Sequence, residues 1–368
     1  MRPRLILSLV ASGALALGGA ACGSSSSSSS SSSGSGGSSK PSGSGTLNGA
    51  GSTLAAPVYQ TWGSKLSGQG VTLNFAAVGS GAGVQQWTAG TADFAASDPA
   101  LKDPEVAAAA SKGKPVHIPT ILGAITISYN LQGVSKLKLD GKTAADIFLG
   151  KVKTWNDPEI KALNAGVTLP STPITVVHRS DSSGTTKGFT SFLAAYSPQW
   201  KSSVGADKSV KWPTGTGAQG NPGVASAIKQ QQGSIGYVEQ AYALKNGFTF
   251  ASIKNKAGQF VDPTLASTSA AGAGAKVPSD LRYTAINASG AASYPIASET
   301  FVIVHQDLCK GGMSQATATA LVKFLNYGLG QGQQDAQQLS YAPLPGPLLA
   351  KAKQAVSSLQ CNGAPIAA

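Results

Sequence analysis

Four short segments of the chain combine glycine with hydroxyl, charged and small side chains, a mixture that suits the binding of an anion. They are residues 49–54, 79–84, 93–99 and 179–185, and each lies where an expected strand or turn meets an expected helix. Glycine lets the backbone approach a ligand closely, and the first amides of a helix lack partners within it and attract negative charge. The chemistry on offer is therefore the binding of an oxyanion by hydroxyls, amides, one arginine and one acid.

The segment at residues 179–185 makes the strongest case. Arg179 offers the planar, two-pronged donor that matches a tetrahedral oxyanion, and Asp181 could hold it in place. Ser183, Gly184 and Thr185 would supply hydroxyls and amides where a helix is expected to begin. The alternative interpretation is a solvated capping turn with a surface ion pair.

The other three segments each have a simpler local interpretation. Thr53 could cap a helix after a glycine-rich turn, and Asp98, which precedes Pro99, could cap another. Their functional roles would be a hydroxyl and a carboxylate that face the ligand. Ser80 could offer both its hydroxyl and its amide. The glycine spacing around Ser80 is like that of a dinucleotide loop, but the matching acidic residue is not evident.

No pattern in the sequence predicts catalysis or a metal site. Ser183 lacks the Gly-x-Ser-x-Gly surroundings of a nucleophilic serine, and His117, His178 and His305 stand in no recognisable catalytic context. Spacings typical of zinc or calcium ligands are missing, as is a P-loop. We therefore expect a protein that is not an enzyme, with structural histidines, no metal and no cofactor.

The elements that would position these segments alternate between strands and helices. Hydrophobic patterns predict strands at residues 71–77, 92–97, 121–129, 174–178 and 301–304. Helices are expected after the Asp103 and Pro104 pair and around residues 189–196, 321–325 and 348–359. This alternation is typical of an α/β fold. Because no linker separates two sequential domains, we expect lobes that exchange chain segments.

Residues 1–21 are typical of a signal peptide. Arg2 and Arg4 precede an apolar stretch that is shorter than a membrane-spanning helix. The small residues before Cys22 resemble a bacterial lipobox, although Gly19 stands where leucine or valine is usual. We expect a lipidated Cys22 and a flexible Ser/Gly tether over residues 22–45. The alternative is an ordinary secretory signal with a chance cysteine.

Charge and cysteine content narrow the choice of partners and of compartment. The formal net charge is +12, or +10 once the two charges of Arg2 and Arg4 are removed. The lysines are scattered and are not clustered with aromatic residues, so we expect no nucleic-acid partner. Cys309 and Cys361 remain after Cys22, and in an exported chain such a pair favours a disulfide over two buried thiols.

In their order and spacing, the four segments resemble the phosphate-binding subunits of bacterial phosphate ABC importers. The resemblance includes residues 146–151, 154–157, 234–239 and 294–296, and it extends from about residue 46 to the C-terminal helix. It implies a type II periplasmic-binding-protein fold, an α/β fold in which two lobes with a hinge enclose a ligand cleft. Residues 46–120 and 298–368 would form lobe one, and residues 121–297 would form lobe two.

The same resemblance implies a set of phosphate ligands drawn from both lobes. Leu54 stands where the family commonly has phenylalanine, but a contact through the backbone amide survives that change. Asp181 would support the arginine. The implied ligands are Thr53, Leu54, Ser80, Asp98, Arg179, Ser183, Gly184 and Thr185.

The expected function is the capture of inorganic phosphate outside the cytoplasm and its delivery to the permease subunits of an ABC importer. We expect a monomer that is held at the outer face of the cell membrane by the lipid on Cys22. Three alternatives stay open: the same fold tuned to another oxyanion such as sulfate, a phosphatase that uses Ser183, or a surface adhesin.

Asp98 is expected to distinguish phosphate from sulfate. Phosphate near neutral pH still carries a proton and can donate a hydrogen bond to a carboxylate, whereas sulfate cannot. A buried charged group without its partner is costly, so a site built around such a bond rejects the analogue that lacks it. Since the implied ligands come from two lobes, phosphate should also shift the protein toward a closed form.

Overall fold

A computed structural model describes residues 45–367 of the chain. The described residues belong to one compact unit. The expected signal peptide (residues 1–21), Cys22 and the tether up to residue 44 lie outside the described residues. Among the helices of the described part, none combines the length and the apolar character that crossing a membrane requires.

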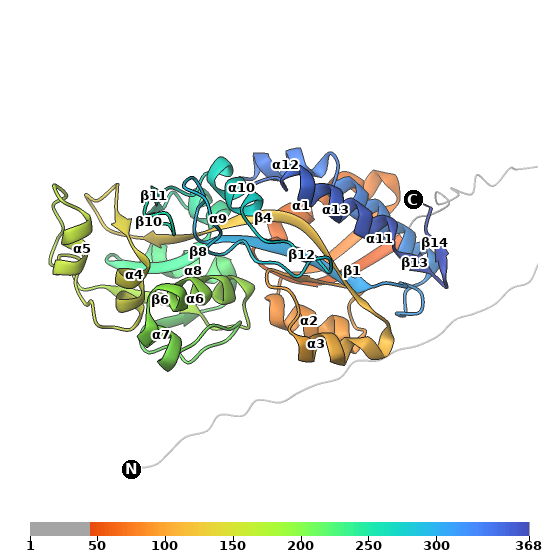
Figure 1. Ribbon diagram of the computed structural model, residues 1–368, viewed down its shortest axis with the longest axis horizontal. Coiled ribbons are helices and arrows are strands. Elements are labelled where there is room, and N and C mark those ends of the chain that lie inside the picture. Colours follow the sequence, from red (N-terminus) through yellow and green to blue (C-terminus); the bar gives the residue numbers. More distant parts are fainter. Residues whose placement is uncertain (1–44, 368) are drawn as a thin grey trace, which may run out of the picture. The chain divides into compact units, whose positions relative to one another are not determined.

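A mixed sheet forms the centre of the fold, and its strands follow the order β2-β1-β3-β12-β4-β8-β6-β7, with β9 paired to β4 (Figure 1). β1 runs parallel to β2 and β3, and β6 runs parallel to β7 and β8. We call β2, β1, β3 and β12 the first half-sheet, and β8, β6 and β7 the second half-sheet. The bounds are β1 Gly45–Gly51, β2 Val71–Ala76, β3 Phe94–Ser97, β4 Pro115–Tyr129, β6 Thr175–Arg179, β7 Thr216–Ala218, β8 Ser234–Glu239, β9 Thr249–Phe250 and β12 Ala297–His305.

β4 joins the two half-sheets. Its residues 115–124 pair with β12, and its residues 125–129 pair with β8. From His117 to Tyr129 every residue of β4 is buried, as expected for a strand covered on both faces. The expected lobe boundaries at residues 120/121 and 297/298 fall inside β4 and at the start of β12. The division into two lobes stays a prediction.

Helices cover both faces of the sheet, and Figure 1 shows α1, α11 and α13 above the first half-sheet with α2 and α3 below it. Two small sheets complete the fold, one of β5, β10 and β11 and one of β13 and β14. The helix bounds are α1 Ala56–Leu66, α2 Ser80–Ala89, α3 Asp103–Ala109, α4 Gly141–Phe148, α5 Pro158–Leu163, α6 Gly184–Tyr196, α7 Pro198–Ser203, α8 Gly220–Gln230, α9 Gln240–Lys245, α10 Leu265–Ala273, α11 Gln315–Gly328, α12 Gly332–Gln338 and α13 Gly346–Ser357. The small strands are β5 Lys138–Leu139, β10 Ser252–Lys254, β11 Phe260–Val261, β13 Gln360–Cys361 and β14 Ala364–Pro365, and short 3-10 turns span Ser67–Gln69 and Ala110–Lys112.

The strands and helices expected from hydrophobic patterns are confirmed, whereas two expected helix caps are wrong. α1 is preceded by Ala55 rather than Thr53, because the chain makes a further turn before the helix begins. α3 begins at Asp103, five residues after Asp98, so the Asp98 carboxylate caps no helix. Both side chains are therefore free for other contacts.

An aromatic cluster fixes α1 against the first half-sheet. Tyr59 and Trp62 on one face of α1 are fully buried, and Tyr59 packs against Phe94 of β3 and Phe324 of α11. The Tyr59 hydroxyl also lies 2.6 Å from the Thr120 hydroxyl on β4. Buried aromatic rings contribute large apolar areas, so this cluster holds the start of α1, and the loop before it, rigidly over the sheet.

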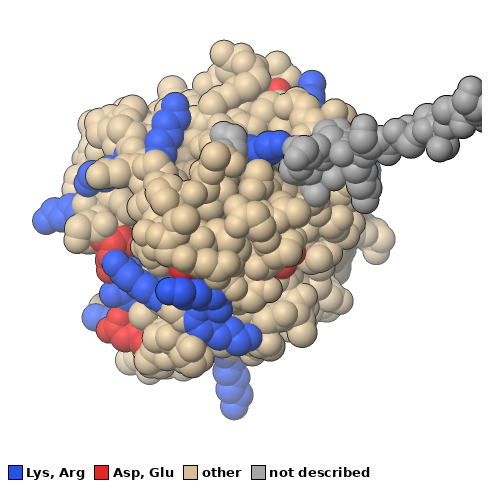
Figure 2. All heavy atoms as spheres, turned by 90° about the vertical axis from the view of Figure 1, so that its right-hand side faces the viewer, with Lys and Arg blue, Asp and Glu red and all other residues tan. Residues whose placement is uncertain are grey.

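The positive charge predicted from composition is visible on the surface. On the face drawn in Figure 2, lysine and arginine side chains outnumber acidic ones, and several gather in its lower part. Wide areas of uncharged surface separate the others. Charge of this kind favours the approach of anions over long distances.

Cys309 and Cys361 are joined in a disulfide. It links the segment after β12 to β13 near the C-terminus, across a sequence separation of 52 residues. In the chain-entropy view, closing a loop of this length restricts the unfolded chain and stabilises the fold by roughly 4 kcal/mol.

Replacing both cysteines by serine should lower the free energy of unfolding by roughly 4 kcal/mol, measured by urea denaturation. Reduction of the unaltered protein should give the same loss, and ligand affinity should not change. A double variant as stable as the unaltered protein would contradict a stabilising disulfide.

Candidate functional site

The segments singled out from the sequence meet at one place because of strand direction. β1, β2 and β3 run parallel, so their carboxyl ends lie at the same edge of the first half-sheet, and the same holds for β6, β7 and β8 in the second. Thr53 follows β1, Ser80 follows β2 and Asp98 follows β3, while Arg179 ends β6. In open α/β sheets this edge is where ligands bind.

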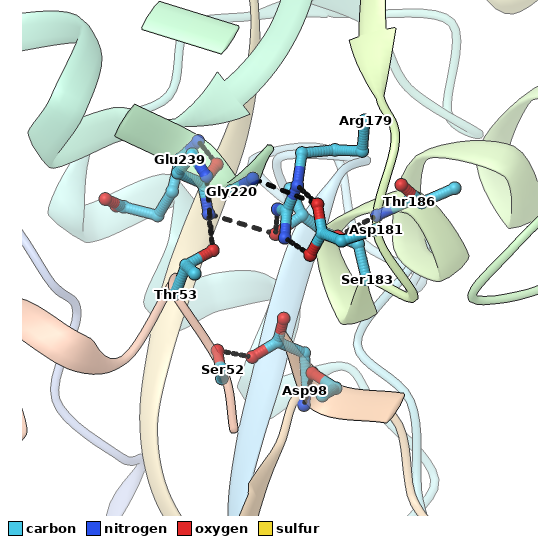
Figure 3. A network of polar contacts seen from close by, with 12 residues as sticks. Ser52, Thr53, Asp98, Arg179, Asp181, Ser183, Thr186, Gly220 and Glu239 are labelled. Carbon is cyan, nitrogen blue, oxygen red and sulfur yellow. Dashed lines mark hydrogen bonds and ion pairs between the residues drawn. The ribbon is translucent and has the colours of Figure 1, made fainter. Parts of the chain in front are cut away.

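The Asp98 carboxylate is fully buried among hydroxyl groups. Its Oδ1 accepts a hydrogen bond from the Ser52 hydroxyl (Figure 3). The same oxygen accepts from the Thr300 hydroxyl on β12 at 3.3 Å. The Asp98 amide donates to the Ser80 hydroxyl at 3.3 Å. Burial raises the pKa of Asp98 to about 6, and the hydrogen bonds and the charge of Arg179 keep burial from raising it further. Asp98 is thus a carboxylate at neutral pH that can accept one more hydrogen bond.

Arg179 is held by a two-pronged contact with Asp181. Its Nε lies 2.7 Å from Asp181 Oδ1, its Nη2 pairs with Oδ2, and the arginine side chain is almost fully buried. Burial opposes ionisation of Asp181, but the bonds and charge of Arg179 hold its pKa below the usual range. The Gly220 amide also donates to Asp181 Oδ1 at 2.9 Å (Figure 3). Arg179 Nη1 faces the Thr185 hydroxyl at 3.3 Å.

The start of α6 lies directly against the residues of the first half-sheet. Ser183 caps α6, and its hydroxyl accepts from the Thr186 amide at 3.1 Å. A Cβ atom placed on Gly184 would lie 2.4 Å from Asp98 Oδ2 and 2.4 Å from Ser80 Oγ. Only glycine therefore fits at position 184, where its backbone touches the other half of the site.

The residues implied by the resemblance thus form one connected group. Thr53 is linked to Thr185 through Asn221, and Ser80 and Asp98 touch Gly184. Leu54 joins the group through its carbonyl, which accepts from the Tyr341 hydroxyl at 2.7 Å, while its side chain lies in the core. Their role as ligands stays a prediction.

Three further residues belong to this network and were not predicted as part of the site. Ser52 adjoins Thr53 in a segment already noted, and Asn221 follows a glycine at a strand-to-helix junction, which is the signal used for the other segments. Glu239 ends β8 within residues 234–239. Its Oε2 accepts from the Ala241 amide at 2.9 Å and lies 2.8 Å from the hydroxyl oxygen of Tyr341.

A second set of contacts joins the same two sides at the start of α3. Asp103 pairs with Arg282 at 2.6 Å, and Glu105 pairs with Lys208. Lys102, next to the helix, pairs with Asp207. Most of these side chains are partly exposed, so each pair is weak alone, but together they favour the arrangement in which the two sides touch.

The histidines make structural contacts. His117 Nε2 accepts from the Leu101 amide at 3.0 Å, and burial lowers the pKa of His117 to about 4. The rings of His178 and His305 stack on Trp212 and Trp87. Among residues 45–367, no cluster of three or more side chains of the types that bind metals occurs.

Comparison with known proteins shows which family this chain resembles. A family model described as the PBP superfamily domain matches residues 36–329. Phosphate-binding protein PstS of Pasteurella multocida is 42% identical over 311 residues, which cover 83% of this chain and 88% of that protein. Phosphate-binding protein PstS 2 of Mycobacterium tuberculosis is 36% identical over 370 residues, covering 96% and 97%. The structure of a human phosphate binding apolipoprotein aligns with a TM-score of 0.70 at 22% identity, covering 87% and 99%.

The chain matches the PBP superfamily domain and shares the fold of this solved structure, so the expected α/β periplasmic-binding-protein fold is confirmed. Within that class, the chain belongs to the PstS family of phosphate-binding proteins.

The buried Glu239 side chain should make the stability of the folded protein depend on pH. Burial raises the pKa of Glu239 to about 8, against the lowering effect of its hydrogen-bonding contacts with Ala241 and Tyr341. The folded protein therefore keeps a proton that the unfolded chain releases near pH 4.5, so its contribution to stability is lost as pH rises toward 8.

Glu239→Gln should remove this dependence. Its free energy of unfolding, relative to the unaltered protein, should rise by up to about 1.4 kcal/mol per pH unit between pH 6 and 8 and then level off. Chemical denaturation at several pH values measures the difference. The partly exposed Glu159, changed to glutamine, is the control, and equal behaviour of the two variants would refute the prediction.

Proposed function

We propose that this protein captures inorganic phosphate at the site between the two half-sheets and delivers it to the permease of an ABC importer. Membership of the PstS family supports this proposal. The observation that carries it is a buried carboxylate, Asp98, next to a buried arginine and a ring of hydroxyl and amide groups. The family acts in transport, which agrees with a binding protein rather than an enzyme.

The arrangement fits a tetrahedral anion that carries a proton. Arg179, the hydroxyls of Thr53, Ser80 and Thr185, and the amides at the start of α6 are donors for its oxygens. The one carboxylate among the predicted ligands, Asp98, is available to accept a hydrogen bond from the anion. Sulfate has no proton at neutral pH and would place an oxygen against this carboxylate without a bond.

A phosphatase that uses Ser183 has no support from the surroundings of that residue. Its hydroxyl caps α6, and within the described residues the histidines make their contacts with Leu101, Trp212 and Trp87 elsewhere. A serine nucleophile needs an adjacent base to become reactive. The buried donors around Ser183 support the binding of an anion instead.

The position of Asp98 predicts the selectivity of the site. We expect a dissociation constant for phosphate below about 1 μM and no heat from sulfate in isothermal titration at pH 8. Asp98→Asn should lower the ratio of phosphate to sulfate affinity by roughly 10- to 100-fold, because an amide can donate to sulfate.

A control variant and a measurement at lower pH make the test of Asp98 more specific. Asp93→Asn removes the same charge from the same segment, where Asp93 accepts from the Asn48 amide, and it should not change selectivity. Since the pKa of Asp98 is about 6, lowering the pH to 5 should protonate it and let sulfate bind. Unchanged selectivity in Asp98→Asn would show that Asp98 does not distinguish phosphate from sulfate.

We also propose that the protein works outside the cytoplasm as a monomer on a lipid anchor at Cys22. The basis is the sequence before residue 45: a signal-like stretch, a lipobox-like cysteine and a serine tether. The tether would let the folded part reach the permease from the membrane surface.

Changing Cys22 to alanine tests the anchor. In a bacterial host, the unaltered protein should incorporate an alkyne-tagged fatty acid and sediment with membranes, and Cys22→Ala should lose both properties while it still binds phosphate. Ser24→Ala is the matched control. Label that persists in Cys22→Ala, or that never appears in the unaltered protein, would contradict the anchor.

A further inference from the structure

Asn221 occupies the centre of the network, between the two half-sheets. It is the second residue of α8, and its side chain is fully buried. Its Nδ2 donates to the Thr53 hydroxyl at 2.9 Å and to the Thr185 hydroxyl at 3.2 Å. Its backbone N–H donates to the Thr53 hydroxyl at 3.2 Å. Asn221 thus contacts one predicted ligand from each side of the site.

The orientation of the Asn221 amide is fixed by its surroundings. Its Oδ1 accepts from the backbone N–H of Glu239 at 3.0 Å. A backbone N–H can only donate, so the oxygen must face Glu239 and the NH₂ group must face the two threonines. Asn221 is therefore a donor to both hydroxyls.

These bonds leave the Thr53 and Thr185 hydroxyls able only to donate their hydrogens. A hydroxyl oxygen has two acceptor positions and one hydrogen to donate. Thr53 accepts from the Nδ2 and the backbone N–H of Asn221, and Thr185 accepts from Asn221 and from Arg179. Within residues 45–367, neither hydroxyl donates to another residue. Each hydrogen must therefore point to a group outside this network.

We propose that Asn221 is a positioning residue that sets the Thr53 and Thr185 hydroxyls as donors to the bound anion. Asn221 fills both acceptor positions of Thr53 and, together with Arg179, those of Thr185, so neither hydroxyl can turn to accept a hydrogen bond from the ligand. The inference rests on the proposed function. It leaves Asp98, rather than Thr53 or Thr185, to receive the proton of the anion, so Asn221 contributes to selectivity without touching the ligand.

The same geometry has a second consequence. One NH₂ group bonds to both sides of the site, so Asn221 is satisfied only when Thr53 and Thr185 are close together. A buried amide that loses such partners is costly. Asn221 therefore couples the orientation of the donors to the approach of the two sides.

The test is a double-mutant cycle measured by isothermal titration of phosphate into the full-length protein. Asn221→Leu removes the amide at similar size, and Thr53→Val with Thr185→Val removes both hydroxyls. Asn221→Leu should weaken phosphate binding about tenfold or more in the unaltered background. In the double-valine background it should change binding by less than about twofold, since no hydroxyl is left to orient. Equal losses in the two backgrounds would overturn the proposal.

A second variant keeps the test decisive if Asn221→Leu does not fold. Asn221→Asp retains the size and the backbone amide but replaces the donor with an acceptor, which would capture the hydroxyl hydrogens. Binding should be weaker than in the unaltered protein, and part of that loss should disappear in the double-valine background. A loss that is the same with and without the hydroxyls would be a charge effect alone and would contradict the inference.

Asn255 gives a matched control for burial. It is also buried, and its Nδ2 donates to the carbonyls of Gly290, Ala291 and Ser293, none of which belongs to the site. Asn255→Leu should lower the melting temperature and leave phosphate affinity unchanged. If it weakens binding as much as Asn221→Leu, Asn221 serves stability only.

If the unaltered protein does not bind phosphate, both the proposed function and this inference are wrong. If the unaltered protein binds phosphate and Asn221→Leu binds it equally well, only the inference is wrong.

Discussion

The burial of charged groups beside one another is the constraint on which the rest of the site depends. Asp98 and Arg179 are both almost inaccessible to water, and a buried charge is tolerated only when hydrogen bonds or an opposite charge replace its hydration. Arg179 is matched by Asp181, and Asp98 by hydroxyls. Because the charge of Arg179 is already matched, the predicted ligands would meet an anion mostly with neutral donors. In the proposed function, recognition therefore depends on the direction of the donor hydrogens more than on net charge.

The fold supplies these donors by repeating one local arrangement on two sides. Each half-sheet contains parallel strands that end at the same edge, and helices begin just beyond them. The first turns of α2, α6 and α8 thus lie close to one another, and the amides at the start of α8 bond to Asp181 and to Thr53 across the site. β4 runs through both half-sheets and sets where the two edges face each other, and the aromatic residues beneath α1 keep the loop that carries Thr53 from moving independently.

The fold class and most residues of the candidate site were predictable from the sequence, and the exceptions have physical reasons. Alternating strand and helix patterns identified the fold class, because periodicity reports burial directly. Glycine-rich junctions located Thr53, Ser80 and Arg179, because close approach to a ligand needs small residues. The caps expected at Thr53 and Asp98 were wrong, since a local pattern does not reveal that a distant group occupies the side chain. Asn221 was missed for the same reason: its partners lie 168 and 36 residues away in sequence.

Position 184 has no room for any side chain larger than that of glycine. The atoms that face it across the site are the carboxylate oxygen of Asp98 and the hydroxyl of Ser80, and both lie within the space that a single methyl group would need. An alanine there would push against both groups, and its methyl could be accommodated only by displacing the Asp98 carboxylate or the Ser80 hydroxyl. The smallest possible enlargement of one side chain would thus force the start of α6 away from the ends of β2 and β3, which makes position 184 the natural place to engineer a protein in which these elements no longer meet.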